Sequence, residues 1–271
     1  MFRKVLGTRL GGVKRLTSIL GGLRLGIPIS SKRFVEISAI LLILFTAFAI
    51  RFLPTRWGPY LAEYDTYFHY RMANYIVENG FQAWFTWFDP LTWYPKGINV
   101  AVTAYPGVAF SAAFIYIFLK TLGIDVSLLT IAMFFPVVMG TLASLALYFL
   151  GKDIGGKEVG LFAAFFLAIN SAFISRTAMG FFDNENIGIL GMILTFLCFV
   201  RSLEEEKPTR NRLLYAFGAG LSLSYVTVSW GATRYVPAML ALFTFLMMLK
   251  GDYSRRLLVS YVISMGLSYS F

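Results

Sequence analysis

The chain has 271 residues, of which 58% are hydrophobic and only 14% are charged, and its mean hydropathy is +0.68. This composition excludes an ordinary soluble domain and predicts an integral membrane protein, because a helix needs roughly 20 apolar residues to cross a bilayer core. The net charge of +10 fits anionic lipid, and no other feature points to nucleic acid. The single cysteine, Cys198, lies in an apolar run, so neither a disulfide framework nor a zinc site is predicted.

The N-terminal 33 residues are basic, with eight Lys and Arg and no acid. Since basic segments stay on the cytoplasmic side of a membrane, residues 1–33 are predicted to be a cytoplasmic tail. An amphipathic segment on anionic lipid is the alternative, and the stretch superficially resembles a transit peptide. The apolar run at 34–53 is long enough to remain as a first span, so no cleavable signal is expected.

Apolar runs along the rest of the chain predict an all-α, polytopic bundle of membrane helices. The expected spans are 34–53, 130–150, 158–175, 186–201, 212–230 and 232–249, with a further run beginning near Leu257.

Residues 105–122 are another apolar run, and whether they cross the bilayer decides the topology. If they do not cross, the basic loops at 151–157, 202–212 and 250–256 all fall on the cytoplasmic side, as short basic loops should. We therefore expect 105–122 to lie against the outer leaflet or to pack on the bundle. The first external loop then runs from about 54 to 129.

This topology brings three carboxylates, Asp65, Asp183 and Glu185, to the outer face of the membrane. Converging carboxylates repel one another and are costly to desolvate, and a divalent cation would compensate both effects. Hard oxygen ligands favour Mg²⁺ or Mn²⁺. Asp183 and Glu185 alone form a weak motif, and the alternative is that they are solvated carboxylates at the start of the helix near Asn186.

Three segments, taken in order along the chain, resemble the catalytic subunit of oligosaccharyltransferase. Residues 63–107, which include "WFDPLTWYPKG", resemble its first external loop; residues 173–189 ("FISRTAMGFFDNENIGI") resemble its second acidic motif; residues 226–236 ("VTVSWGATRYV") resemble its Ser-Trp-Gly segment. The resemblance covers nearly everything from residue 34 onward. It implies a membrane glycosyltransferase fold of the GT-C type.

The resemblance also implies an activity: transfer of an oligosaccharide from a polyprenyl or dolichyl phosphate or pyrophosphate to Asn in N-x-Ser/Thr sequons. The expected partners are the lipid-linked donor, an acceptor protein or peptide, and membrane lipids. Another polyprenyl-phosphate-sugar-dependent glycosyltransferase is an alternative, although the long first-loop match favours the asparagine acceptor. A transporter is a further alternative, but no internal repeat is found and the acids fall at span ends.

The resemblance assigns roles to individual residues. Asp65 is implied to be catalytic, in contact with both the metal and the acceptor amide, and Asp183 and Glu185 are implied to be metal ligands. Arg176 is implied to hold an acid in place or to meet the donor phosphate, although an Arg at a helix end is also often an interface anchor.

The Ser-Trp-Gly segment supplies two more candidates for substrate binding, Trp230 and Arg234. The sequence after Gly231 departs from the family's usual Gly-Tyr continuation, which puts the donor contact of this segment in question. Arg234 either faces the lipid phosphate or snorkels to headgroups.

The only histidine, His69, follows Asp65 by four residues and could share its helical face. We expect a hydrogen-bonded structural residue, because the family positions do not ask for a histidine ligand here. The loop aromatics Trp84, Trp87, Trp93 and Tyr94 are expected to serve in packing and interface anchoring.

The chain stops inside an apolar segment, whereas full members of this family continue with further spans, another catalytic acid and a soluble domain. We therefore expect an N-terminal fragment that is inactive by itself, or one whose second half another polypeptide supplies. The expected location is an archaeal plasma membrane, with the endoplasmic reticulum membrane as the alternative.

Overall fold

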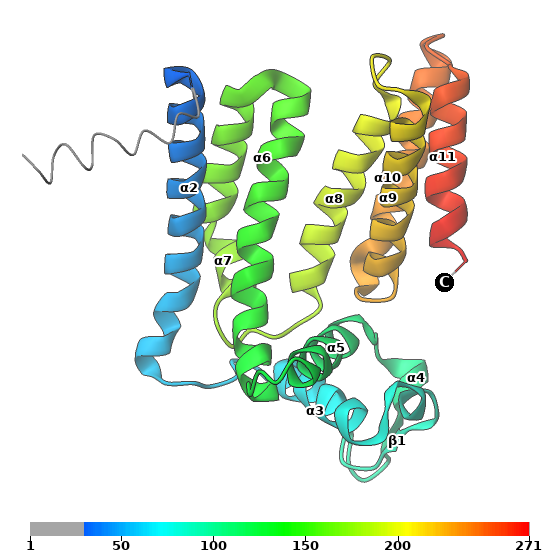
Figure 1. The fold of residues 1–271 in the computed structure, drawn as a ribbon. Helices are drawn as coiled ribbons and strands as arrows, with labels where there is room; N and C mark the ends of the chain where they lie inside the picture. The colour runs from blue at the N-terminus through cyan, green and yellow to red at the C-terminus, as the bar shows by residue number, and fades with distance from the viewer. Residues whose placement is uncertain (1–29, 271) are drawn as a thin grey trace, which may run out of the picture. The chain divides into compact units, whose positions relative to one another are not determined.

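The computed structural model describes residues 30–270, which are almost entirely helical (Figure 1). The chain divides into two compact units, Met1–Ser38 and Ala39–Phe271, and the contacts below all lie within the second. Most of the predicted basic tail, residues 1–29, lies outside the described residues.

The helices follow one another with short connections. In chain order they are α2 (Ser31–Phe52), η1 (Leu53–Trp57), α3 (Tyr64–Asn79), η2 (Phe81–Thr86), α4 (Val100–Thr103), α5 (Gly107–Thr121), α6 (Leu128–Ile169), α7 (Ser171–Thr177), α8 (Glu185–Leu203), α9 (Thr209–Thr227), η3 (Gly231–Arg234), α10 (Tyr235–Leu249) and α11 (Arg255–Ser268). Two short strands, β1 (Phe88–Asp89) and β2 (Ile98–Asn99), pair antiparallel between η2 and α4.

Four of the described helical segments are long and apolar enough to cross a membrane. They are Ser31–Trp57, Leu128–Ile169, Glu185–Leu203 and Gly231–Leu249. The second contains both spans predicted at 130–150 and 158–175, because Gly156, at φ +87°, breaks α6 into two arms. This confirms the predicted all-α bundle of membrane helices.

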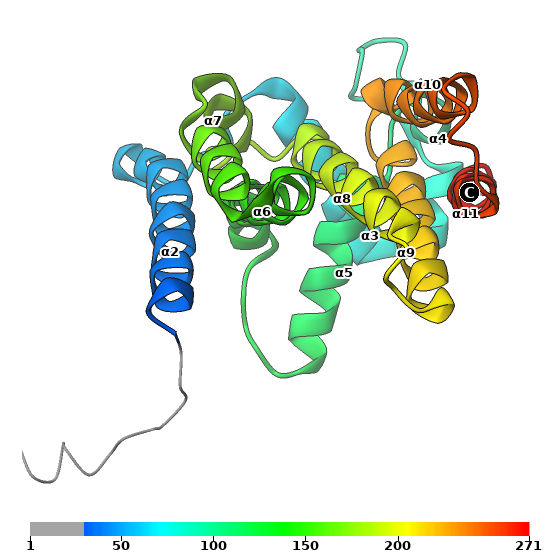
Figure 2. The same cartoon turned by 90° about the horizontal axis from the view of Figure 1, so that it is seen from above.

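The spans predicted at 212–230 and beyond Leu257 form α9 and α11, which stand in the same bundle but fall short of the four segments in length or apolar composition. α9 begins with the polar residues Thr209–Arg212, which explains its lower hydropathy, and α11 has only 14 residues. α8 packs on α6 and α9, and α9 packs on α11 (Figures 1 and 2).

The apolar run at 105–122 forms α5, a helix of 15 residues that is shorter than the membrane-spanning segments. Figure 1 views α5 nearly end-on and Figure 2 along its length, so it runs across the direction of α6 and α8. It packs on α3 through Ala109 and Ala112, which are fully buried with Ala73 and Ile76. The run thus packs on α3 and α6, and its position outside the bilayer stays a prediction.

The loop between η2 and α4 is held by one buried carboxylate. Asp89, with no exposed surface, accepts hydrogen bonds from Arg71 Nη2 at 2.6 Å, from the Leu91 N–H at 3.0 Å and from Thr92 Oγ1 at 2.6 Å. A buried carboxylate needs such donors to offset its desolvation. The Arg71 contact joins the hairpin to α3, and the other two hold the loop together.

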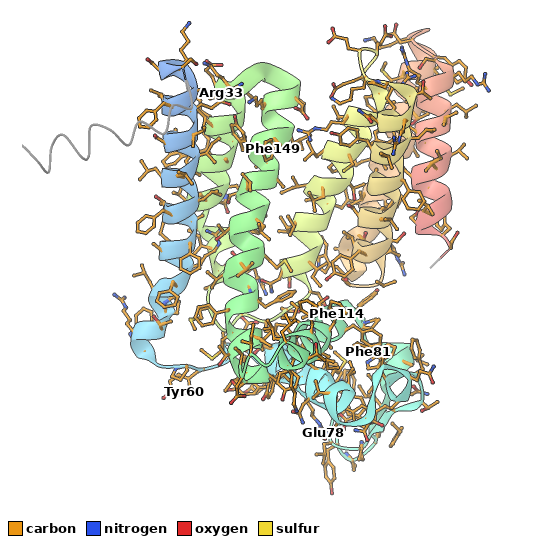
Figure 3. The ribbon with its side chains drawn as sticks, viewed as in Figure 1. Arg33, Tyr60, Glu78, Phe81, Phe114 and Phe149 are labelled. Atoms are coloured by element: carbon orange, nitrogen blue, oxygen red, sulfur yellow. The ribbon has the colours of Figure 1, made fainter. Side chains whose placement is uncertain are left out.

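The aromatic residues of this loop divide into two groups. Trp84 and Trp87 are buried, and Trp87 stacks on Tyr75 of α3 with ring centroids 4.1 Å apart, as the packing prediction requires. Trp93 and Tyr94 are each 81% exposed. Phe81, labelled in Figure 3, packs edge-on against Phe110 of α5.

Candidate active site

The turn between α7 and α8 is held by the first loop and two helices. The Met179 N–H donates to the Arg51 carbonyl at 2.9 Å, and the Ala62 N–H donates to the Gly180 carbonyl at 3.0 Å. Gly180 has φ +87°, and a Cβ there would lie 2.2 Å from the Tyr60 carbonyl oxygen, so only glycine fits. These contacts bring the acidic residues 183–185 next to the start of α3.

Asp183 is 7% exposed and takes part in a hydrogen bond with His69 of α3, its Oδ1 lying 3.0 Å from His69 Nε2. Its Oδ1 also accepts the Asn184 N–H at 2.6 Å. Burial raises the pKa of Asp183, but the hydrogen bonds from His69 and the Asn184 backbone outweigh it and hold the pKa below its ordinary value. Asp183 is therefore an ionised carboxylate in a mostly buried position.

Glu185, in the first turn of α8, shares a guanidinium with Glu63, the residue before α3. Arg176 Nη1 lies 3.9 Å from an oxygen of each carboxylate, and its guanidinium also sits 5.1 Å from the Phe181 ring centroid. Arg176 therefore bridges the acidic turn and the start of α3. Its guanidinium is about half exposed, which leaves it open to a further anion.

Asp65 is exposed and occupies the first turn of α3, one helical turn before His69. Residues i and i+4 share a helix face, so Asp65 stands on the same side of α3 as the His69–Asp183 contact. It also lines a cavity of about 660 Å³ together with Arg71 and Trp93.

The structure brings Asp183 and Glu185 together with Arg176, while Asp65 remains at the edge of this group. Among residues 30–270, no three His, Cys, Asp or Glu side chains are close enough to form a metal-binding group. The predicted convergence of all three acids on one centre is therefore not seen in this conformation of the chain.

The oxygen atoms of this turn nevertheless fit a hard divalent cation. Glu185 Oε2 and Asn184 Oδ1 are buried and have no hydrogen-bond partner among the described residues, beside the ionised Asp183. Buried oxygens without donors are normally satisfied by water or an ion. Mg²⁺ and Mn²⁺ prefer such carboxylate and amide oxygens.

Trp230 lies against the start of α8. A Cβ at Gly188 would approach Trp230 Cε3 to 2.3 Å, so the indole packs directly on the α8 backbone one turn after Glu185. Arg234, at the end of η3, is exposed, and no ion pair is formed with it by the described residues. Of the two candidates from this segment, Trp230 borders the acidic turn.

The two loop segments singled out in the sequence interlock. The Gly107 N–H donates to the Val228 carbonyl at 3.2 Å, and a Cβ at Gly107 would lie 1.8 Å from Ser229 Oγ. A Cβ at Gly231 would likewise lie 2.9 Å from the Tyr105 hydroxyl. Close approach of these backbones, which glycine permits, docks the first loop onto the end of α9.

Sequence reasoning missed two features of the site. Glu63 was not singled out, because Glu63-x-x-Thr66 has the reverse order of the Ser/Thr-x-x-Glu/Gln capping box. In the structure the Glu63 N–H donates to Thr66 Oγ1 at 3.3 Å at the start of α3. His69 is hydrogen bonded, as expected, but its partner is the acid of the second motif. The sequence placed His69 four residues after Asp65, on the same helix face. It gave no sign that His69 would contact Asp183, which is 114 residues away in the chain.

Comparisons with known proteins agree with this architecture. A profile of the family described as oligosaccharyl transferase STT3, N-terminal, matches residues 34–270. The chain is 34% identical over 223 residues to the dolichyl-diphosphooligosaccharide–protein glycosyltransferase subunit STT3A of Oryza sativa subsp. japonica, covering 82% of this chain and 28% of the relative. It is 31% identical over 234 residues to the subunit stt-3 of Caenorhabditis elegans, covering 86% of this chain and 30% of that relative. The chain thus spans less than a third of the length of these relatives.

Solved structures of the Archaeoglobus fulgidus oligosaccharyltransferase share the fold. The structure of AglB with an inhibitory peptide and a dolichol-phosphate matches with a TM-score of 0.70 at 21% identity, covering 88% of this chain and 29% of that one. The complex with zinc and sulfate matches with a TM-score of 0.68 at 22% identity, covering 85% of this chain and 30% of that one. The form tethered with an acceptor peptide containing the NVT sequon matches with a TM-score of 0.72 at 20% identity, covering 88% of this chain and 29% of that one. With the family profile matching nearly the whole chain, this protein belongs to the oligosaccharyl transferase STT3 family.

Proposed function

We propose that this chain forms the N-terminal part of an enzyme that transfers an oligosaccharide from a polyprenyl or dolichyl phosphate carrier to asparagine in N-x-Ser/Thr sequons. The observation that carries the proposal is the buried Asp183, held by His69 and adjacent to the Arg176–Glu185 pair at the end of the first loop. Membership of the family supports it, as do the dolichol-phosphate and sequon peptide bound by the Archaeoglobus protein.

The proposed metal ligands are Asp65, Asp183 and Glu185, and the proposed metal is Mn²⁺ or Mg²⁺. The unpartnered Glu185 Oε2 supports this assignment, as does the zinc in one Archaeoglobus structure. Asp65 lies one helical turn from His69, so a rearrangement of the first turn of α3 would be needed to bring it to the other two acids. A bound cation would supply positive charge to the leaving phosphate.

The chain's own side chains would act on the two substrates. Asp65 would accept an N–H of the acceptor amide, whose nitrogen is a poor nucleophile because its lone pair is delocalised into the carbonyl. Arg176 would meet the donor phosphate with its exposed edge. Trp230 and Arg234 are proposed to contact the donor on the same side of the bundle.

We also propose that residues 1–33 are cytoplasmic, that residues 34–271 belong to the transmembrane domain with a first external loop at about 54–129, and that the acids face outward. The basic loops that follow α8 and α10 lie at the bundle end opposite to the acidic turn, as the positive-inside rule requires (Figure 1). An archaeal plasma membrane is the proposed location, with the endoplasmic reticulum membrane as the alternative.

The metal site is tested by Mn²⁺ binding to the purified protein in nanodiscs, followed by electron paramagnetic resonance. Asp65→Ala, Asp183→Ala and Glu185→Ala should each weaken binding at least about tenfold if the acids share one ion. Asp125→Ala, an exposed aspartate before α6, is the matched control and should have no effect. Unchanged binding in the Asp183 and Glu185 variants would contradict the site.

Transfer is tested with a chimera in which residues 34–270 replace the matching segment of a curated relative. Glycosylation of a fluorescent N-x-Thr peptide by the chimera, lost in its Asp183→Ala variant and kept in its Asp125→Ala variant, is the expected result. A chimera that inserts normally and binds donor but is insensitive to Asp183→Ala would refute the proposed role of the acidic turn.

A further inference from the structure

A cavity of about 430 Å³ lies between the ends of α8, α9 and α11, far from the acidic turn. Arginines form much of its wall: Arg212 comes from α9, and Arg255 and Arg256 come from α11. Ser202, in the last turn of α8, also lines it. Since α8 begins at Glu185 and rises about 1.5 Å per residue, the cavity is roughly 25 Å from the proposed active site.

Two of the three arginines that line this cavity form no ion pair with the described residues. Arg256, the third arginine, pairs with Glu205, and the neighbouring acids Glu204 and Asp153 pair with Lys207 and Arg201. Glu206, in the loop between α8 and α9, is exposed to solvent. In the described part of the chain, neither Arg212 nor Arg255 forms an ion pair. Arg212 and Arg255 therefore bring positive charge to the cavity without a direct carboxylate partner in the described part of the chain.

Arg212 is held in place but incompletely satisfied. Its Nη2 donates to Thr209 Oγ1 at 2.9 Å, while its Nε is buried and has no hydrogen-bond partner among residues 30–270. A buried guanidinium N–H is costly to leave unpaired, and a charged acceptor satisfies it best. The unpaired Nε–H of Arg212 therefore indicates an anionic ligand in the cavity.

The first turns of two helices add to the same charge. α9 begins at Thr209 and α11 at Arg255, so both helices direct their N-terminal N–H groups toward this end of the bundle. Helix N-termini carry partial positive charge and favour phosphate.

Two apolar side chains also line the cavity, beside the arginines and Ser260. Leu213 follows Thr209 by four residues and Val259 follows Arg255 by four residues, and both side chains line the wall. Four residues of helix span about 6 Å. Arginines and apolar side chains in one lining match a lipid, with its phosphate at the arginines and its acyl chain on Leu213 and Val259, better than they match a free anion.

We propose that this cavity binds the phosphate headgroup of an anionic phospholipid. Arg212 and Arg255 contact the phosphate, and Leu213 and Val259 contact the first methylenes of an acyl chain. Basic pockets between membrane helices bind such headgroups on the cytoplasmic side, which is the side that the proposed orientation gives this end. Lipid binding is measured without the oligosaccharide donor or the acceptor peptide. A failure of lipid binding can therefore be told apart from a failure of the proposed glycosyl transfer.

The test measures binding of fluorescently labelled phosphatidylglycerol to the purified 271-residue chain in a neutral detergent, with labelled phosphatidylcholine as the reference lipid. Arg212→Gln and Arg255→Gln should each weaken phosphatidylglycerol binding about fivefold. Arg210→Gln is the matched control, because Arg210 is an exposed arginine on the same helix that does not line the cavity. Its affinity should stay within about twofold of the parent chain.

Arg212→Lys separates loss of charge from loss of fold, because it keeps the charge and should keep most of the preference for phosphatidylglycerol. Competition with unlabelled lipid and with excess inorganic phosphate identifies the source of the anion. Equal affinity for the two lipids, or an equal effect of Arg210→Gln, would overturn the proposal. Displacement by inorganic phosphate as effective as by phosphatidylglycerol would replace the lipid with a small anion.

Discussion

His69 Nε2 and Asp183 Oδ1 lie 3.0 Å apart, and this contact joins the first loop to the acidic turn before α8. Both side chains are mostly buried, and the residues are 114 positions apart in the chain. The contact aligns one carboxylate of the proposed metal site and places α3, with Asp65, beside it. His69 is therefore proposed as a positioning residue for Asp183.

The first prediction concerns this contact. His69→Ala should weaken Mn²⁺ binding about tenfold, because residues that orient a metal-binding carboxylate typically contribute that much. His69→Asn should retain more affinity, since its amide can still donate to Asp183. Electron paramagnetic resonance titration measures both.

The matched control on the same helix is Asn74→Ala, which removes only a surface hydrogen bond to Glu78. Equal Mn²⁺ affinity in the parent chain and in His69→Ala would show that Asp183 needs no orientation by His69.

The interlocked loops give a second prediction. Gly107→Ala places a methyl group 1.8 Å from the original position of Ser229 Oγ, so the first loop must shift away from the end of α9. We expect a loss of about 1–3 kcal/mol in the free energy of unfolding, as for other overpacked sites. The thermal unfolding midpoint in detergent reports it.

Gly266→Ala is the matched control for that substitution, because nothing lies within 4 Å of a Cβ at Gly266 in α11. There the added methyl group should be neutral or should stabilise by about 0.5 kcal/mol through helix propensity. If both alanine variants shift the thermal unfolding midpoint by the same amount, the close contact between Gly107 and Ser229 does not contribute to stability.

A third prediction concerns Arg51, which has no exposed surface. Its Nε donates to Thr177 Oγ1 at 2.7 Å, and its Nη1 donates to the Ala47 and Ala168 carbonyls at 3.0 Å each. Thr177→Val keeps the shape but leaves the Nε–H unsatisfied, which should cost about 1–3 kcal/mol.

Thr46→Val is its isosteric control. The Thr46 hydroxyl donates only to the Leu42 carbonyl one turn earlier in α2, so its removal should change stability by less than about 0.5 kcal/mol. Thermal unfolding of both variants side by side decides the point, and a midpoint unchanged by Thr177→Val would mean that water replaces the lost acceptor.

The fourth prediction concerns Asp89. Asp89→Ala leaves Arg71 and two further donors without their acceptor, and we expect a loss of about 2 kcal/mol, less than for a fully buried pair because Arg71 is partly exposed. The hairpin should open more often, so trypsin should cleave after Lys96 faster than in the parent chain.

Asp125→Ala serves as the control, because Asp125 is exposed on the loop before α6. An Asp89→Ala chain that resists trypsin as well as this control does would show that the two strands and the stacked Trp87 suffice to hold the loop.

The relation between sequence and structure differs from element to element. The all-helical class and the order of the apolar segments were readable from the sequence, because composition and hydropathy are local properties. The choice of Asp183 and Glu185 came from the family resemblance and stays a prediction. The helix boundaries were also close: the expected span 186–201 became α8, Glu185–Leu203.

What only the tertiary structure decided are the contacts between distant segments. The partner of His69, the sharing of Arg176 by Glu63 and Glu185, and the arginine cavity at the far end each depend on how helices pack. Hydropathy and spacing report which residues are apolar or charged within one helix. They contain no information on which side chain of another helix will face them, because that follows from the packing of whole helices and loops.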